Sequence, residues 1–209
     1  MPTGTPDTER VIFHQTNFGD CVACRRLSDA RPFTAHGLAR RLSRSLRRTP
    51  QGGTLSVQVT VQTNPAGLAF SVDGTTYSST QTFSRASGSS HTIATTSPQS
   101  GGTGIRYVWT RWSDNSAISH TVTPTTNKTY TATFKKQYYL TMTHGTGGTV
   151  SPGSGWRDSG VTVSITATPS TGYSFSNWAG TGTGSYSGTT NPGSITMGGP
   201  ITEAATFTQ

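Results

Sequence analysis

The chain has 209 residues with a formal net charge of +8, and only 11% of its residues are charged. Because globular proteins have about 25% charged residues, a fold of long helices held by Glu–Lys pairs is excluded. A composition rich in Gly, Ser and Thr favours short strands joined by turns instead, so we expect an all-β fold.

Residues 1–53 differ from the rest and are predicted to be a basic N-terminal extension, partly helical or disordered. Nine arginines and four acidic residues lie within residues 1–50. Residues 37–48 place leucine at every fourth position, which makes a thin apolar stripe on a basic helix. The segment fits an anchor on an anionic surface, a solvated tail, or a stretch translated upstream of the true start. Since the positive charge lies mainly here, nucleic acid is not predicted as a partner.

Two cysteines in this extension, Cys21 and Cys24, have the spacing of a redox pair or of half a zinc site. A tetrahedral zinc site needs four ligands, and the sequence offers no second close pair. The redox interpretation requires a surrounding βαβ pattern, which the sequence lacks. An incidental thiol pair is therefore favoured, and no cofactor is expected.

No stretch of the sequence approaches the roughly 18 apolar residues that span a membrane, so no transmembrane segment is predicted. The apolar run at residues 11–13 is also shorter than the signal-peptide core of about 7–15 residues. Nothing in the sequence as written directs export.

From residue 55 onward, alternating apolar residues and turn residues predict two series of short strands. The first series covers residues 55–61, 69–72, 80–83, 91–95, 105–112, 119–122 and 129–134. The second covers residues 138–143, 148–151, 161–168, 173–178, 194–197 and 204–208. Such strands are typical of small β-sandwiches, Ig-like or β-grasp-like.

The two series repeat one another, which predicts two tandem modules at residues 54–136 and 137–209. Residues 59–61 align with 140–142, an offset of 81, and residues 132–134 align with 205–207, an offset of 73. Between them an aromatic signature recurs at an offset of 66. Its members, with the closing phenylalanine of each module, are predicted to be structural aromatics of the repeat: Tyr107, Trp109, Trp112 and Phe134, and Tyr173, Phe175, Trp178 and Phe207.

The tryptophans of this signature allow two interpretations. Trp112 and Trp178 have the opposite parity to the other aromatics of their strands, so strict alternation would expose one set. An exposed indole could stack on a sugar ring. Alternatively, a bulge turns each indole inward to complete a small core, which the recurrence favours. Trp156, in an expected turn with no counterpart in the first module, is the better candidate for a ligand contact.

The sequence gives little sign of catalysis. Nucleophile elbows and phosphate-binding loops are absent. The modules contain four acidic residues, all expected to form turns: Asp73, Asp114, Asp158 and Glu203. Nothing indicates that two of them converge as a glycosidase requires, so we do not expect an enzyme.

Residues 138–208 carry an opening strand "YYLTMT", a Gly-Gly hairpin, "SGW", "ATP", "GYSFSNW" and a closing "ATF". In these pieces the second module resembles the divergent internalin B-repeat family of bacterial secreted and surface proteins. The first module resembles a related bacterial repeat in "RYVWTRWSD" and "TYTATF". Its "VDG" and "GSSHT" are similar to PEGA surface modules. Both resemblances imply a non-catalytic extracellular or envelope module.

The sequence thus predicts a spacer or adhesion segment of a bacterial cell-surface or secreted protein. The alternative is a carbohydrate-binding module that uses Trp156 with Trp112 or Trp178. The expected partners are a cell-surface glycan or another envelope protein. The chain is further expected to belong to a longer repeat array.

Overall fold

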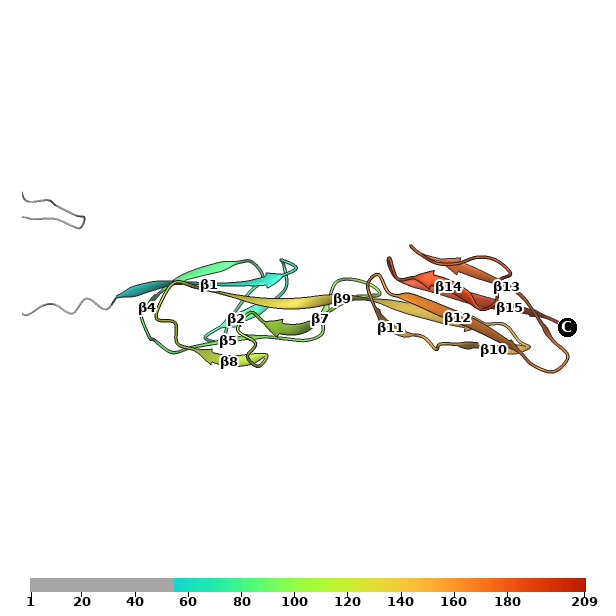
Figure 1. Ribbon diagram of the computed structural model, residues 1–209, viewed down its shortest axis with the longest axis horizontal. Helices are drawn as coiled ribbons and strands as arrows, with labels where there is room; N and C mark the ends of the chain where they lie inside the picture. The colour runs from blue at the N-terminus through green and yellow to red at the C-terminus, as the bar shows by residue number, and fades with distance from the viewer. Residues whose placement is uncertain (1–54) are drawn as a thin grey trace, which may run out of the picture. The chain divides into compact units, whose positions relative to one another are not determined.

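The computed structural model describes residues 55–209 and confirms an all-β fold, with no helix among these residues (Figure 1). Its strands are β1 (Ser56–Asn64), β2 (Phe70–Val72), β3 (Thr75–Tyr77), β4 (Gln81–Ala86), β5 (His91–Thr95), β6 (Gln99–Ser100), β7 (Ile105–Trp112), β8 (Ser119–Val122), β9 (Lys128–His144), β10 (Gly148–Ser151), β11 (Gly155–Asp158), β12 (Thr162–Pro169), β13 (Ser174–Thr181), β14 (Gly193–Thr196) and β15 (Ile201–Thr208). The basic segment 37–48 and the cysteine pair lie outside the described residues.

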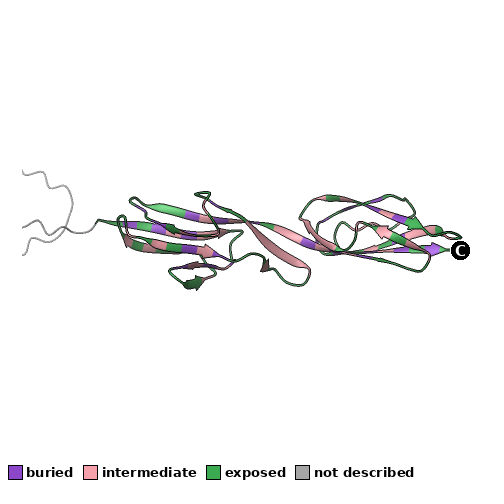
Figure 2. Ribbon diagram, turned by 90° about the horizontal axis from the view of Figure 1, so that it is seen from below, coloured by how far each residue is buried: buried purple, intermediate pink, exposed green. Residues whose placement is uncertain are grey.

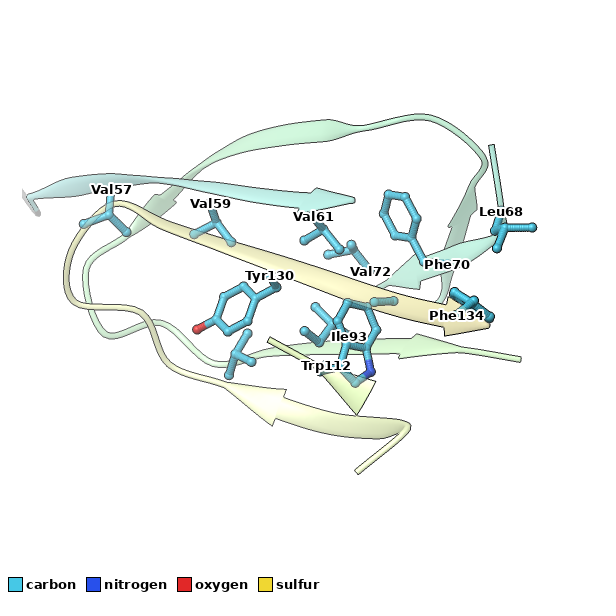
Figure 3. Close-up of a cluster of buried hydrophobic side chains, with 12 residues drawn as sticks. Val57, Val59, Val61, Leu68, Phe70, Val72, Ile93, Trp112, Tyr130 and Phe134 are labelled. Carbon is cyan, nitrogen blue, oxygen red and sulfur yellow. The ribbon is translucent and has the colours of Figure 1, made fainter. Parts of the chain in front are cut away.

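Residues 55–136, which we call the first half, form two layers. One layer contains β4, β1, the beginning of β9, β7 and β6, and the other has the order β3-β2-β5-β8. Apolar side chains from both layers form one buried cluster. Figure 3 shows Val57, Val59 and Val61 in a row along β1, with Ile93 and Trp112 in the same cluster. Burying each such aliphatic side chain contributes about 1.5–3 kcal/mol.

Residues 137–209, the second half, repeat this layering. One layer contains β13, β15, the end of β9 and β11, and the other has the order β10-β12-β14. A second cluster of buried side chains lies between them, with Leu140, Ile165 and Ile201 almost fully buried. Figure 2 shows buried positions alternating with exposed ones along the strands, as a sheet with one buried face requires.

The two halves share their main strand pairings, although β3 and β6 of the first half have no counterpart in the second. In each half the first strand lies beside the last strand in parallel: β1 with β9, and β9 with β15. The aromatic strand, β7 or β13, is antiparallel to the last strand. The strand registers agree with the repeat offsets of 81 and 73 found in the sequence. Thr63 pairs with Ala132 in the first half, and the residues 81 and 73 positions later, His144 and Ala205, pair in the second half.

Each aromatic strand contains an irregularity at the same place. The register against the last strand shifts between Trp109 and Arg111 in β7, and between Phe175 and Asn177 in β13. The extra residue changes the phase of the strand, so a side chain of opposite parity also points inward. The structure therefore confirms the interpretation in which a bulge turns the tryptophan of each strand inward.

Two features of the fold differ from expectation. The strands expected at residues 129–134 and 138–143 are one continuous strand, because Lys135, Lys136 and Gln137 remain extended and paired. Three short strands, β3, β6 and β11, were not expected. The last of these contains Trp156, so its placement in a turn was wrong.

Candidate functional site

Trp156 lies on β11, directly opposite Tyr139 of β9. The two rings pack edge to face, with centroids 5.2 Å apart and planes at 75°. Both residues are half-buried. Tyr139 is flanked in sequence by Tyr138 and Leu140, which point into the core. Because side chains alternate along a strand, Tyr139 points outward, and the pair forms an aromatic patch on the outer face of the sheet.

A chain of polar contacts holds the indole of Trp156 in place. The guanidinium of Arg106 on β7 reaches across β9 and lies 4.5 Å from the centre of the Trp156 ring. Arg106 Nε donates to Gln137 Oε1 at 2.8 Å, and Gln137 Nε2 donates to Asp158 Oδ1 at 2.5 Å. Lys135 Nζ lies 3.0 Å from Asp158 Oδ2. Cation–π stacking at a partly exposed site contributes about 0.5–1 kcal/mol, so this network orients the ring more than it stabilises the fold.

The carboxylate of Asp158 is stabilised in its charged form by these neighbours. The hydrogen bond from Gln137, followed by the contact with Lys135, lowers the pKa of Asp158 below its ordinary value. Asp158 therefore stays ionised near neutral pH and compensates one of the lysine charges beside the aromatic patch.

The patch borders an open groove of about 450 Å³. Its lining comes from β9, β11, β13 and β15 and from the loop before β7: Thr103, Gly104, Tyr139, Thr141, Trp156, Thr181, Gly182, Pro200, Ile201 and Thr202. Gly104, with φ of +68°, approaches Pro200 so closely that a Cβ there would lie 2.9 Å from the proline Cβ. Gly104 O also accepts the Tyr139 N–H at 2.9 Å. Residues of both halves thus build this groove.

The other two tryptophans named as ligand candidates lie in the cores. Trp112 is 0% exposed and Trp178 is 1% exposed, so neither presents a ring face on which a sugar could stack. Trp112 Nε1 donates to Ile118 O at 3.1 Å, whereas Trp178 Nε1 has no hydrogen-bond partner within residues 55–209. A ligand contact at either indole would require the core to open.

Ser89, His91 and Asp73 have the spacing of a serine-protease triad, which the sequence did not suggest. Ser89 Oγ lies 2.8 Å from His91 Nε2, and His91 Nδ1 lies 2.8 Å from Asp73 Oδ2. However, Ser89 Oγ is also 2.6 Å from the carbonyl oxygen of Ala86, which can only accept, so the hydroxyl proton points away from the imidazole. The N–H groups of Gly88 and Ser89 already donate to backbone carbonyls and offer no oxyanion site. We interpret the cluster as a structural link between a turn and β5.

Two of the four acidic residues lie in turns as expected, and the other two lie in strands. Asp73 and Asp114 lie in turns. Asp158 is the last residue of β11, where it pairs with Gln137 of β9. Glu203 lies within β15 and is 0% exposed. Glu203 Oε1 accepts the Tyr186 N–H at 2.8 Å, while Oε2 has no partner among the described groups. The turn expectation was wrong for Asp158 and Glu203 because both are paired in strands, and the alternation of β15 points Glu203 inward.

Residues 55–209 contain no group of three His, Cys, Asp or Glu side chains that could hold a metal ion. In the same part of the chain, no helix is long and apolar enough to cross a membrane. Cys21 and Cys24 lie outside the described residues, so the search for metal ligands does not include them.

Residues 138–209 match the family model of the divergent InlB B-repeat domain. The match confirms the resemblance of the second half to internalin B-repeats. Such a repeat domain suggests a bacterial surface repeat protein. It does not include the first half, for which the PEGA-like resemblance stays a prediction. A search of the curated proteins found no match, and a search of the solved structures found none either.

Proposed function

We propose that the chain is a spacer segment of a bacterial cell-surface or secreted protein, made of two tandem repeat domains at residues 54–136 and 137–209. The repeat-family match of the second half supports the class of protein. The separate core clusters of the two halves support the partition into two domains. Other envelope proteins are the expected partners of such a segment.

The continuous strand β9 is the observation that carries this proposal. Residues 135–137, where a linker would lie, pair with Val108, Tyr107 and Arg106 of β7. Gln137 and Tyr138 also pair with β11 on the opposite edge of β9. A flexible tether needs unpaired backbone, and this junction has little. A spacer built in this way keeps its two halves at a fixed separation.

Distance measurements between two spin labels test the spacer function in the full chain. Thr126→Cys and Thr171→Cys place exposed labels in the two halves, with Cys21→Ser and Cys24→Ser removing the native thiols. Because the junction is paired on both edges, we expect a narrow distance distribution. A four-residue Gly-Ser insertion after Lys135 is the control, and it should broaden the distribution. A distribution as broad in the uninserted protein as in this control would overturn the spacer proposal.

The groove beside Trp156 favours saccharide binding as a second function. Ligand sites combine apolar and aromatic walls with a few polar groups, and this groove has both kinds of lining. Binding on a glycan array that disappears in Trp156→Ala, while circular dichroism shows an intact fold, is the expected result. Binding that persists in this variant would contradict a site at the groove.

A further inference from the structure

We propose that the groove at the beginning of β7 binds a neutral glycan chain and that both halves of the protein contribute to this site. The inference rests on the saccharide-binding function proposed above and names the ligand class.

The lining of the groove argues for an uncharged ligand. Its side chains are hydroxyl, aromatic or aliphatic, and the lining contains no Asp, Glu, His, Lys or Arg. Three cations beside the groove already have partners: Arg106 contacts the Trp156 ring and Gln137, Arg157 donates to the carbonyl oxygens of Trp156 and Gly153, and Lys135 pairs with Asp158. An ionised sugar would lose hydration here without gaining a charged partner, which is costly. A neutral sugar exchanges its hydrogen bonds with water for bonds to hydroxyl and backbone groups.

The polar groups of the groove form a row. Thr181 pairs with Thr202, and Thr202 pairs with Thr141, on three neighbouring strands. Adjacent strands lie about 4.8 Å apart, so the three hydroxyl groups follow one another at about this spacing across the sheet. Each hydroxyl can both donate and accept, as the hydroxyls of a sugar do. The row suits an extended chain of sugar rings that runs across the strands.

The aromatic wall is fixed before any ligand arrives. Trp156 packs against Tyr139 on one side and carries the guanidinium of Arg106 over its ring. A side chain that is already ordered loses little entropy when it contacts a ligand, which favours binding.

The fold itself does not require this aromatic pair. The equivalent strands of the first half are β1 and β4, where Gln58 pairs with Ser84 in the place of Tyr139 and Trp156. Since the first half forms the same pairing without aromatic residues there, the pair at the groove is explained better by a contact outside the fold than by packing within it.

Titration of the full chain with hexasaccharides tests the proposal. The neutral probes are cellohexaose, maltohexaose and mannohexaose, and the acidic probe is hexagalacturonic acid. The four tryptophans give four indole N–H signals in ¹H–¹⁵N spectra. We expect a neutral probe to shift the Trp156 signal and to leave those of the buried Trp112 and Trp178 unchanged.

Two threonines of β15 provide a matched pair of variants, since both are exposed but only Thr202 lines the groove. Thr202→Val should weaken binding about 2–10-fold, the effect of one hydrogen bond, and Thr206→Val should leave it unchanged. Trp156→Leu, which keeps apolar bulk but not a flat ring, should weaken binding at least about 10-fold.

The possible failures are distinguishable. Tighter binding of hexagalacturonic acid than of every neutral probe, with the Trp156 signal shifting, would overturn the neutral ligand class and leave saccharide binding intact. Absence of binding by all four probes would overturn both. Equal loss of affinity in Thr202→Val and Thr206→Val would overturn the placement of the ligand in the groove.

Discussion

The two halves of the molecule share their main strand pairings but fill one equivalent core position differently. Tyr130 pairs with Val61 in the first half, and Glu203 pairs with Met142 in the second. The offsets of the repeat make these two positions equivalent. A buried aromatic ring in one half is thus replaced by a buried carboxyl group in the other.

The second half accommodates the carboxyl group with a glycine. A Cβ at Gly180 would lie 2.5 Å from one carboxylate oxygen of Glu203 and 2.8 Å from the other. The equivalent tryptophans differ as well, since only Trp112 has a hydrogen-bond partner for its indole N–H among the described residues. Strand pairing and the bulge therefore persist although the polar interior of the two halves differs.

The largest expected effect comes from the buried indoles. Trp112→Ala and Trp178→Ala should each destabilise their own half by about 3–5 kcal/mol, because each leaves a large cavity in a small core. Hydrogen exchange read by mass spectrometry should show faster exchange in β1, β2 and β5 for the first variant, and in β12 and β14 for the second. Equal loss of protection in both halves from either variant would break the comparison and the partition into two domains.

Glu203 should give the second half a pH dependence that the first half lacks. Burial raises the pKa of Glu203 above its ordinary value of 4.5, against the hydrogen bond from the Tyr186 N–H. The folded state then holds its proton more tightly than the unfolded state. The contribution to stability is full below pH 4.5 and is lost as the pH rises through the raised pKa.

Glu203→Gln should abolish this slope and stabilise the second half at pH 8 by about 1.4 kcal/mol for each unit by which the pKa is raised. Urea denaturation at several pH values measures the effect, with the unfolding of the second half monitored by hydrogen exchange in β12 and β14. The first half serves as the internal control. An unchanged slope in Glu203→Gln would assign the pH dependence to another group.

Asp73 should give the smallest effect, with the opposite sign. Burial alone would raise the pKa of Asp73, but hydrogen bonds from His91 and from the Thr92 N–H, with Arg85 nearby, hold it below its ordinary value of 3.8. Its contribution is present above pH 3.8 and is lost as the pH falls through the lowered pKa.

Asp73→Asn should cost the first half about 0.2–1 kcal/mol at pH 7, since Asp73 is 40% exposed and such pairs are screened by solvent. Urea denaturation at pH 7 and pH 3 measures this cost, which should be smaller at pH 3. A loss as large at pH 3 as at pH 7 would show that the turn geometry at Asp73, and not its charge, is responsible.

The sequence predicted the fold where alternation and repetition are strong. Alternation such as that of Val57, Val59 and Val61 was enough to predict the all-β class. The offsets of the repeat were enough to align the two halves. The continuity of β9 could not be predicted from residues 135–137, because two lysines and a glutamine look like a loop. Their strand conformation depends on pairing with β7, which is distant in sequence.

The groove was predicted only in part. The sequence indicated Trp156 as a candidate ligand contact because it has no counterpart in the first module, but it did not indicate the neighbouring Tyr139 and Arg106. The parity of Tyr138 and Tyr139 could have indicated that the second tyrosine points outward. The approach of Arg106 and Gly104 could not have been read from the sequence, because it depends on how β7 and β15 follow one another along one edge of β9.

The parallel pairing of first and last strands has a mechanical consequence. When the two ends of such a domain are pulled apart, the paired strands slide along each other, so all hydrogen bonds between them bear the load together. Six residue pairs join β1 to β9, and five join β9 to β15. Because β9 belongs to both pairs, the tensile load passes from one domain to the next through a single extended backbone.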